Sequence, residues 1–141
     1  MKASIEWTGD AGFMGKTGSG HSVQMDGPPD HGGKNLGPRP MEMLLLGLGG
    51  CAAFDVTLIL RRGRQEIMAC RAEIEAERAE EDPKVFTRIH MHFVIEGRDV
   101  DPKRVERAIS LSAEKYCSAS IMLAKTATIS HDFEIVELSG R

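Results

Sequence analysis

The chain lacks the features that mark nucleic-acid-binding, secreted and disulfide-stabilised proteins. Its 18 Lys and Arg residues are balanced by 21 Asp and Glu residues, and they form no basic stripe with interleaved aromatic residues, so we expect no nucleic-acid partner. Its three cysteines are widely spaced and fit neither a disulfide framework nor a zinc ribbon. The N-terminus shows no basic segment followed by an apolar one. We therefore expect a soluble, cytoplasmic protein.

The longest apolar run, Met43 to Leu60, is interrupted and is short for a bilayer span of about 20 residues. We expect no membrane association and predict a buried central helix instead. Pro40 suits the first helical position. The cations Arg61 and Arg62, followed by Gly63, suit the C-terminal end of the helix. The interruptions are Gly47, Gly49, Gly50 and Asp55.

The glycines in this helix predict a close neighbour beside Cys51. A glycine in a helix interior costs about 1 kcal/mol relative to alanine, so three of them within about one turn need a compensating gain. Glycine is tolerated where another backbone must come close. Cys51 is therefore either inert packing in a tight contact or a sheltered reactive thiol.

The other segments alternate between strand and helix patterns. Expected strands cover residues 3–8, 12–17, 21–25, 66–78, 85–96 and 126–137, and further helices cover 102–117 and 118–124. In the first strand of the central hairpin, the apolar face is expected to hold Met68, Cys70, Ala72, Ile74 and Ala76. This order predicts one domain over residues 1–141, of the α+β class with a mainly antiparallel sheet packed on the long helix.

Cys51 and Cys117 are the residues best suited to chemistry, because glycine, alanine and serine surround each sulfur. The alternative is a pair of ordinary buried cysteines. If a helix restarts at Ser118, Cys117 lies at its N-terminus, where unpaired amides favour a thiolate. Cys51 is mid-helix and needs a nearby cation, for which Lys34 and Arg39 are the upstream candidates.

Two acidic residues of the central helix have more than one interpretation. Glu42 lies nine residues before Cys51, about 13 Å along a straight helix, so it cannot touch that sulfur directly. It acts through a bridging arginine, acts on the cysteine of a second subunit, or simply favours the helix dipole. Asp55, one turn beyond Cys51, either orients a group near the sulfur or bonds to Arg61 or Arg62.

Three further residues are weaker candidates. We expect Cys70 to pack in the core, as free cysteines usually do. His90 and His92 share one face of their strand, where they form either a metal site or a solvated or cross-strand pair. We favour the second interpretation and predict no metal site.

Two segments together resemble one known family. They are Pro40-Met-Glu-Met-Leu-Leu-Leu-Gly-Leu-Gly-Gly-Cys51, and Glu114-Lys-Tyr-Cys117 followed by Ser-Ala-Ser-Ile-Met-Leu. They resemble the OsmC/Ohr family of osmotically inducible and organic-hydroperoxide-resistance proteins. The Gly-Pro-Arg-Pro-Met-Glu sequence before the helix is most similar to the YhfA-like branch, and the predicted element order agrees over essentially the whole chain.

The resemblance implies an intertwined homodimer with two active sites at its interface. It implies that Cys51 attacks a peroxide and becomes a sulfenic acid, and that Cys117 then resolves it as a disulfide. Glu42 matches the family glutamate that holds an arginine over the reactive thiolate. Arg39 takes the arginine's role by default, because it is the only arginine upstream of Cys51. Ser118 stands where peroxidase members commonly have proline.

The activity implied is a cysteine-based peroxidase in the oxidative stress response. Its substrates are alkyl or fatty-acid hydroperoxides, its reductant is a dithiol of the lipoyl or thioredoxin type, and it needs no metal or organic cofactor. Two other functions stay open on the same fold. One is a redox-sensing or hydrophobic-ligand-binding dimer with little turnover, and the other is a structural dimer with inert cysteines.

Overall fold

Helix α1, Pro40–Arg62, is the longest element of the computed structural model, which describes residues 1–139. The Glu42 carboxylate accepts a hydrogen bond of 2.9 Å from the Arg39 backbone N–H, which is one half of a capping box. Arg61 and Arg62 complement the helix dipole in the last turn. Both predicted ends of this helix are confirmed.

Only one stripe of α1 is buried. Its members recur every four residues: Leu48, Ala52, Val56 and Leu60. Leu46 and Phe54 on other faces are 63% and 66% exposed, so the prediction of a buried helix is confirmed only along this stripe in the single chain. Within the described residues, α1 is the one helix long and apolar enough to cross a membrane by length and composition alone, with a hydropathy of 2.0.

The chain forms two compact units, and α1 contributes to both. The first unit, residues 1–46, contains an antiparallel meander of three strands. These strands are β1 (Ala3–Gly9), β2 (Gly12–Thr17) and β3 (Ser22–Met25). The meander confirms the prediction, because turn residues separate three short strand patterns in the sequence.

A buried carboxylate organises the loop that follows β3. Asp26 accepts hydrogen bonds from the backbone amides of Gly27, Lys34 and Leu36 at 2.9 to 3.2 Å. These bonds, chiefly those from Lys34 and Leu36, hold the pKa of Asp26 below its ordinary value. The loop includes the short 3-10 helix η1 (Pro29–His31). Asp26 therefore fixes the chain that leads into α1.

The second unit, from residue 47 onward, contains a mixed sheet of β4 (Glu66–Arg78), β5 (Phe86–Arg98) and β6 (Thr128–Glu137). Strands β4 and β5 form the predicted antiparallel hairpin, but β6 runs parallel to β5. The chain between β5 and β6 makes a helical crossover, which returns the last strand in the same direction. The expectation of a mainly antiparallel sheet holds for the first unit and only partly for this one.

The apolar face of β4 is as predicted except at its start. Cys70, Ala72, Ile74 and Ala76 are half-buried, whereas Met68 is 61% exposed. A register shift between Ile67 and Ala69 accounts for the difference. Because an extra residue in one strand reverses the alternation of faces, Ile67 is half-buried in place of Met68.

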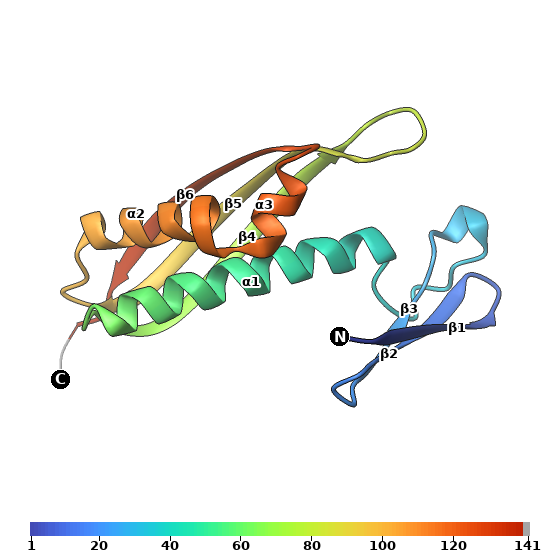
Figure 1. Cartoon of the computed structure of the whole chain (residues 1–141), viewed down its shortest axis with the longest axis horizontal. Coiled ribbons are helices and arrows are strands. Elements are labelled where there is room, and N and C mark those ends of the chain that lie inside the picture. The colour runs from blue at the N-terminus through green and yellow to red at the C-terminus, as the bar shows by residue number, and fades with distance from the viewer. Residues whose placement is uncertain (140–141) are drawn as a thin grey trace. The chain divides into compact units, whose positions relative to one another are not determined.

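The crossover begins with α2 (Pro102–Leu111), whose N-terminus is capped by the Asp101 carboxylate as predicted. It continues through a π-helical turn, η2 (Ser112–Tyr116), to the short helix α3 (Ser118–Leu123). Figure 1 shows α2 and the second-unit part of α1 on the same face of the β4–β5–β6 sheet. The site described below forms between α1 and the junction of η2 and α3.

Candidate functional site: a buried thiol pair

Cys51, Asp55 and Cys117 form one cluster. Their two sulfurs and one carboxylate oxygen lie within 4.8 Å of one another, and all three cysteines of the chain are free. Cys51 and Asp55 are four residues apart on α1, so they share a helix face. Cys117 reaches them from the junction of η2 and α3. The two cysteines predicted from their small neighbours are therefore adjacent in space.

Cys117 is fully buried and caps α3. Its sulfur accepts a hydrogen bond of 3.3 Å from the Ser120 backbone N–H. Burial raises the pKa of the Cys117 thiol, hydrogen bonds from Ser120 lower it, and the neighbouring Cys51 raises it further. The backbone amide at the start of α3 favours the thiolate as expected, but the cost of burying the charge is larger, so the pKa of Cys117 is raised overall.

Cys51 is only partly buried, and so is Asp55 beside it. The Ser112 hydroxyl donates a hydrogen bond of 3.0 Å to Asp55 Oδ2. Asp55 thus lies near the sulfurs, as one interpretation of the sequence proposed, and it makes no salt bridge to Arg61 or another cation in the described part of the chain.

Ser112 was missed by the sequence reasoning, although a signal for it exists. It is a serine in the apolar stripe of the second predicted helix, and only 2% of its surface is exposed. A buried hydroxyl needs a hydrogen-bond partner. Its partner, Asp55, lies 57 residues earlier in the chain, which no local pattern reveals.

Arg39 and Glu42 lie in the first unit and pair with each other, their Nη1 and Oε1 atoms 3.7 Å apart. Lys34, the other candidate cation for Cys51, pairs with Asp10 at 3.1 Å. The interpretation of Glu42 as a helix-start residue is supported by its bond to the Arg39 amide. The roles of Arg39 and Glu42 toward the reactive thiol stay predictions.

The third cysteine, Cys70, lies apart from this cluster. It is half-buried on β4, where burial raises the pKa of its thiol and a hydrogen bond with Thr57 of α1 lowers it. A hollow of about 290 Å³ lined in part by Thr57, Arg61 and Cys70 lies beside it. The expected core packing of Cys70 is thus partial, and this residue offers a matched control for the thiol pair.

His90 and His92 form the cross-strand arrangement that we favoured. The Asp132 and Glu134 carboxylates of β6 accept hydrogen bonds from the His92 ring, with Nδ1–Oδ1 and Nε2–Oε1 distances of 2.7 and 3.1 Å, and His90 contacts Ser130 and Asp132. These carboxylates, Asp132 foremost, raise the pKa of His92. These hydrogen bonds lie on the exposed surface of the sheet and include no cysteine, so they are separate from the thiol cluster.

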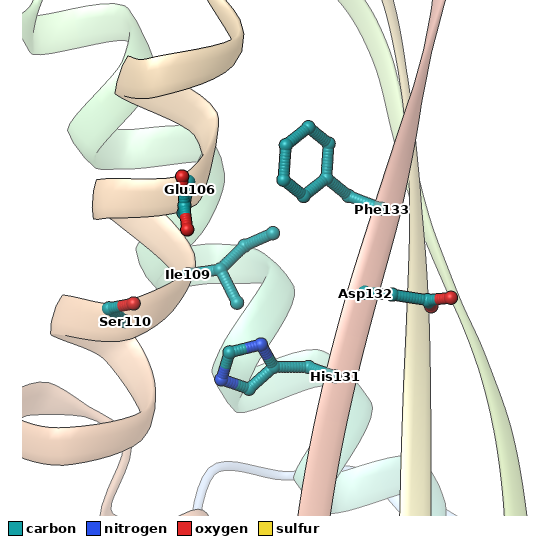
Figure 2. A pocket seen from close by; sticks show the side chains of 6 residues that line it. All are labelled: Glu106, Ile109, Ser110, His131, Asp132 and Phe133. Atoms are coloured by element: carbon teal, nitrogen blue, oxygen red, sulfur yellow. The ribbon is translucent and has the colours of Figure 1, made fainter.

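A further hollow of about 310 Å³ lies between α2 and β6. Figure 2 shows Ile109 and Phe133 extending into it, His131 facing Ser110, and Asp132 pointing to the other side of the sheet. None of the predicted site residues lines it. The thiol cluster, which joins nucleophilic sulfurs to a carboxylate, is therefore the stronger candidate for chemistry.

The long helix α1 and the α2–α3 segment, together with the β4–β5–β6 sheet, form an α+β fold that holds the thiol pair. A family model described as OsmC-like protein matches residues 32–132. The chain belongs to the OsmC-like protein family, which confirms the resemblance seen in the sequence.

Three relatives illustrate the range of similarity. The protein YhfA of Escherichia coli K12 is 46% identical over 136 residues, which cover 96% of this chain and 98% of YhfA. A crystal structure of a hypothetical protein from Aquifex aeolicus VF5 is 29% identical, with a TM-score of 0.86 and coverage of 98% and 97%. The organic hydroperoxide resistance protein OhrB of Bacillus subtilis is 16% identical, with a TM-score of 0.64 and coverage of 94% and 96%; this likeness shows the shared fold alone.

Proposed function

We propose that this protein is a thiol-dependent peroxidase that reduces organic hydroperoxides through a Cys51 sulfenate and a Cys51–Cys117 disulfide. The observation that carries the proposal is the approach of the two free sulfurs to within 4.8 Å of each other. A disulfide needs about 2.05 Å between sulfurs, so a local adjustment must bring the two sulfurs together before the bond forms. The fold shared with OhrB, an organic hydroperoxide resistance protein, is consistent with this chemistry.

The reaction proceeds in three balanced steps. The Cys51 thiolate attacks the terminal oxygen of the hydroperoxide, the O–O bond breaks, and the alkoxide leaves and takes up a proton as the alcohol. Cys117 then attacks the Cys51 sulfenic acid, the S–S bond forms, and water leaves with the thiol proton. A dithiol reduces the disulfide by thiol exchange and leaves as its own cyclic disulfide.

The burial of the two cysteines supports this division of roles. Cys51 is partly exposed, so a hydroperoxide can reach its sulfur, whereas Cys117 is fully buried. The raised pKa of Cys117 keeps it a thiol at neutral pH. It becomes reactive only toward an oxidised sulfur placed beside it, as a resolving cysteine requires.

We also propose a homodimer in the cytoplasm, in which a second copy covers the exposed face of α1. Phe54 is 66% exposed, and a Cβ added at Gly47 or Gly50 meets no atom within 4 Å. Small residues beside a large apolar one suit a close helix contact. Sedimentation equilibrium checks this: Phe54→Glu is expected to give a folded monomer, and a wild-type monomer at all concentrations overturns the proposal.

One observation favours the alternative of a redox sensor or ligand-binding dimer with little turnover. The carboxylate of Asp55 lies beside both sulfurs, whereas reactive cysteines commonly lie beside a cation. Lys34 and Arg39 are already paired with carboxylates in the first unit. A slow reaction of Cys51 with peroxide follows if no cation approaches it in the dimer.

Consumption of an alkyl hydroperoxide with a dithiol as reductant separates these functions. Wild type is expected to turn over, Cys51→Ser to be inactive, and Cys117→Ser to stop after one oxidation. Cys70→Ser is the matched control and is expected to keep full activity, because its sulfur lies outside the cluster. Wild-type consumption equal to that of Cys51→Ser contradicts the peroxidase and leaves the sensing or binding function.

A further inference from the structure

We propose that reduced Cys51 and Cys117, together with Asp55, bind one thiophilic divalent cation, with Zn²⁺ the expected occupant. The three ligand atoms already lie within 4.8 Å of one another. A tetrahedral zinc ion with bonds of about 2.3 Å to sulfur and about 2.0 Å to oxygen places its ligands about 3.5–3.8 Å apart. The cluster therefore needs to contract by at most roughly 1 Å to hold the ion. From the sequence alone, we expect no metal at this position.

The charges in the cluster favour a cation. It contains a carboxylate and two ionisable thiols, and Asp55 has no salt bridge among the described residues. Zn²⁺ displaces one proton from each thiol and is then surrounded by three anionic ligands. The two-sulfur, one-oxygen set suits zinc better than magnesium or calcium, which prefer oxygen ligands.

Hydrogen bonds to the ligands give the cluster an outer shell of the kind that metal sites use. Ser112 donates to Asp55 Oδ2, which orients the carboxylate and leaves its other oxygen available. The Ser120 backbone N–H donates to the Cys117 sulfur.

The Ser120 hydroxyl is a second polar group beside the Cys117 sulfur. It is fully buried and has no hydrogen bond of good geometry within residues 1–139, but it contacts the Cys117 sulfur and lowers the pKa of that thiol. Buried hydroxyls are normally paired. A metal-bound thiolate is a stronger acceptor than a thiol, so metal binding at Cys117 would strengthen the contact with this hydroxyl.

Three protein ligands leave the fourth position of a tetrahedral ion open to water or a small ligand. The metal and the disulfide are mutually exclusive, because sulfurs bonded to each other at about 2.05 Å cannot both ligate the ion. A hydroperoxide that takes two electrons from the two thiolates, takes up two protons and leaves as alcohol and water therefore also releases the metal. Binding itself requires only the reduced thiols and stands apart from peroxidase turnover.

Titration of the reduced, metal-free full-length protein with Co²⁺ under anaerobic conditions tests the site. We expect thiolate-to-cobalt charge-transfer bands and the intense visible bands of tetrahedral cobalt. They should saturate at one ion per chain and disappear when Zn²⁺, which binds such ligands more tightly, is added. The protein oxidised beforehand to its disulfide is expected to show none of these bands.

Variants identify the ligands. Cys51→Ser and Asp55→Asn are expected to bind Co²⁺ at least about tenfold more weakly, and Cys70→Ser is expected to bind as wild type does. Circular dichroism checks that each variant is folded.

Absence of charge-transfer bands in reduced wild type overturns the proposal, as does an unchanged Co²⁺ affinity in Cys51→Ser or a weakened affinity in Cys70→Ser. Unchanged affinity in Asp55→Asn overturns the three-ligand set. Peroxide consumption is measured separately with a chelator present, so a failure of the peroxidase proposal leaves this test intact.

Discussion

The Ser112 hydroxyl donates a hydrogen bond of 3.0 Å to Asp55 Oδ2, and this bond ties the π-helical turn η2 to α1 beside the two sulfurs. Ser112 is 2% exposed. Ser112→Ala leaves the half-buried carboxylate without this donor and is expected to destabilise the reduced protein by about 1–3 kcal/mol. Urea unfolding measures the loss. Ser110→Ala on α2, at a half-exposed position, is the control, and equal midpoints for the two variants contradict the role of this bond.

The two site cysteines should differ strongly in alkylation. Cys51 is partly exposed, whereas Cys117 is fully buried and burial raises the pKa of its thiol. With a chelator present at neutral pH, iodoacetamide is expected to modify Cys51 first, because the thiolate is the nucleophile and must be accessible. Peptide mass spectrometry at successive times measures both rates. Faster modification of Cys117 contradicts the assignment of roles.

Asp26 should make the loop before α1 sensitive to acid. Its folded-state pKa lies below its ordinary value of 3.8, so its contribution to stability is present above that value and is lost as the pH falls through the folded pKa. Asp26→Asn replaces one of the two accepting carboxylate oxygens with an NH₂ group, which cannot accept a hydrogen bond from a backbone N–H. The substitution therefore removes the carboxylate's contribution to stability at every pH.

Hydrogen-exchange protection of the Lys34 and Leu36 amides measures this effect locally, because both amides donate to Asp26 Oδ2. The difference in protection between wild type and Asp26→Asn is expected to be largest near neutral pH and to shrink below 3.8. Asp30→Asn, an exposed change in the same loop, is expected to leave protection unchanged. A pH-independent difference would argue against this account.

The three helix glycines should respond differently to alanine. At Gly49 an added Cβ would lie 2.9 Å from Ile74 Cδ1, whereas at Gly47 and Gly50 it meets nothing within 4 Å in the single chain. In a monomer, alanine at Gly47 or Gly50 adds about 1 kcal/mol of helix stability. In the proposed dimer, Gly50→Ala is expected to weaken association despite a stronger helix.

Sedimentation equilibrium over a range of protein concentrations measures the effect of Gly50→Ala on association. Leu36→Ala, a change at an exposed loop position, serves as the control. Tighter or unchanged association of Gly50→Ala shows that this face of α1 is not the dimer contact.

Local signals predicted much of the fold and the thiol pair. Pro40 and Arg61-Arg62 mark the ends of α1, because a proline and terminal cations act within one turn of a helix. The small residues beside Cys51 and Cys117 indicated space around each sulfur, and the structure places the two sulfurs near each other. The family followed from the same segments.

The features that the sequence did not reveal depend on contacts between distant residues. A strand pattern of period two is the same in parallel and antiparallel pairs, so the direction of β6 was not predictable from it. The bulge that exposes Met68 is a pairing feature of β4 and β5. The helix-end position of Cys117 suggested a lowered pKa, but burial among other elements raises it.

Identification of the disulfide formed by one equivalent of an alkyl hydroperoxide tests the central claim most directly. Reduced, metal-free protein is oxidised, remaining thiols are blocked, and peptides are mapped by mass spectrometry without reduction. The proximity of the sulfurs predicts one linkage, Cys51–Cys117 within a chain, with Cys70 recovered as a blocked thiol. Unlinked Cys51 and Cys117, or a disulfide that includes Cys70, would contradict the two-cysteine mechanism.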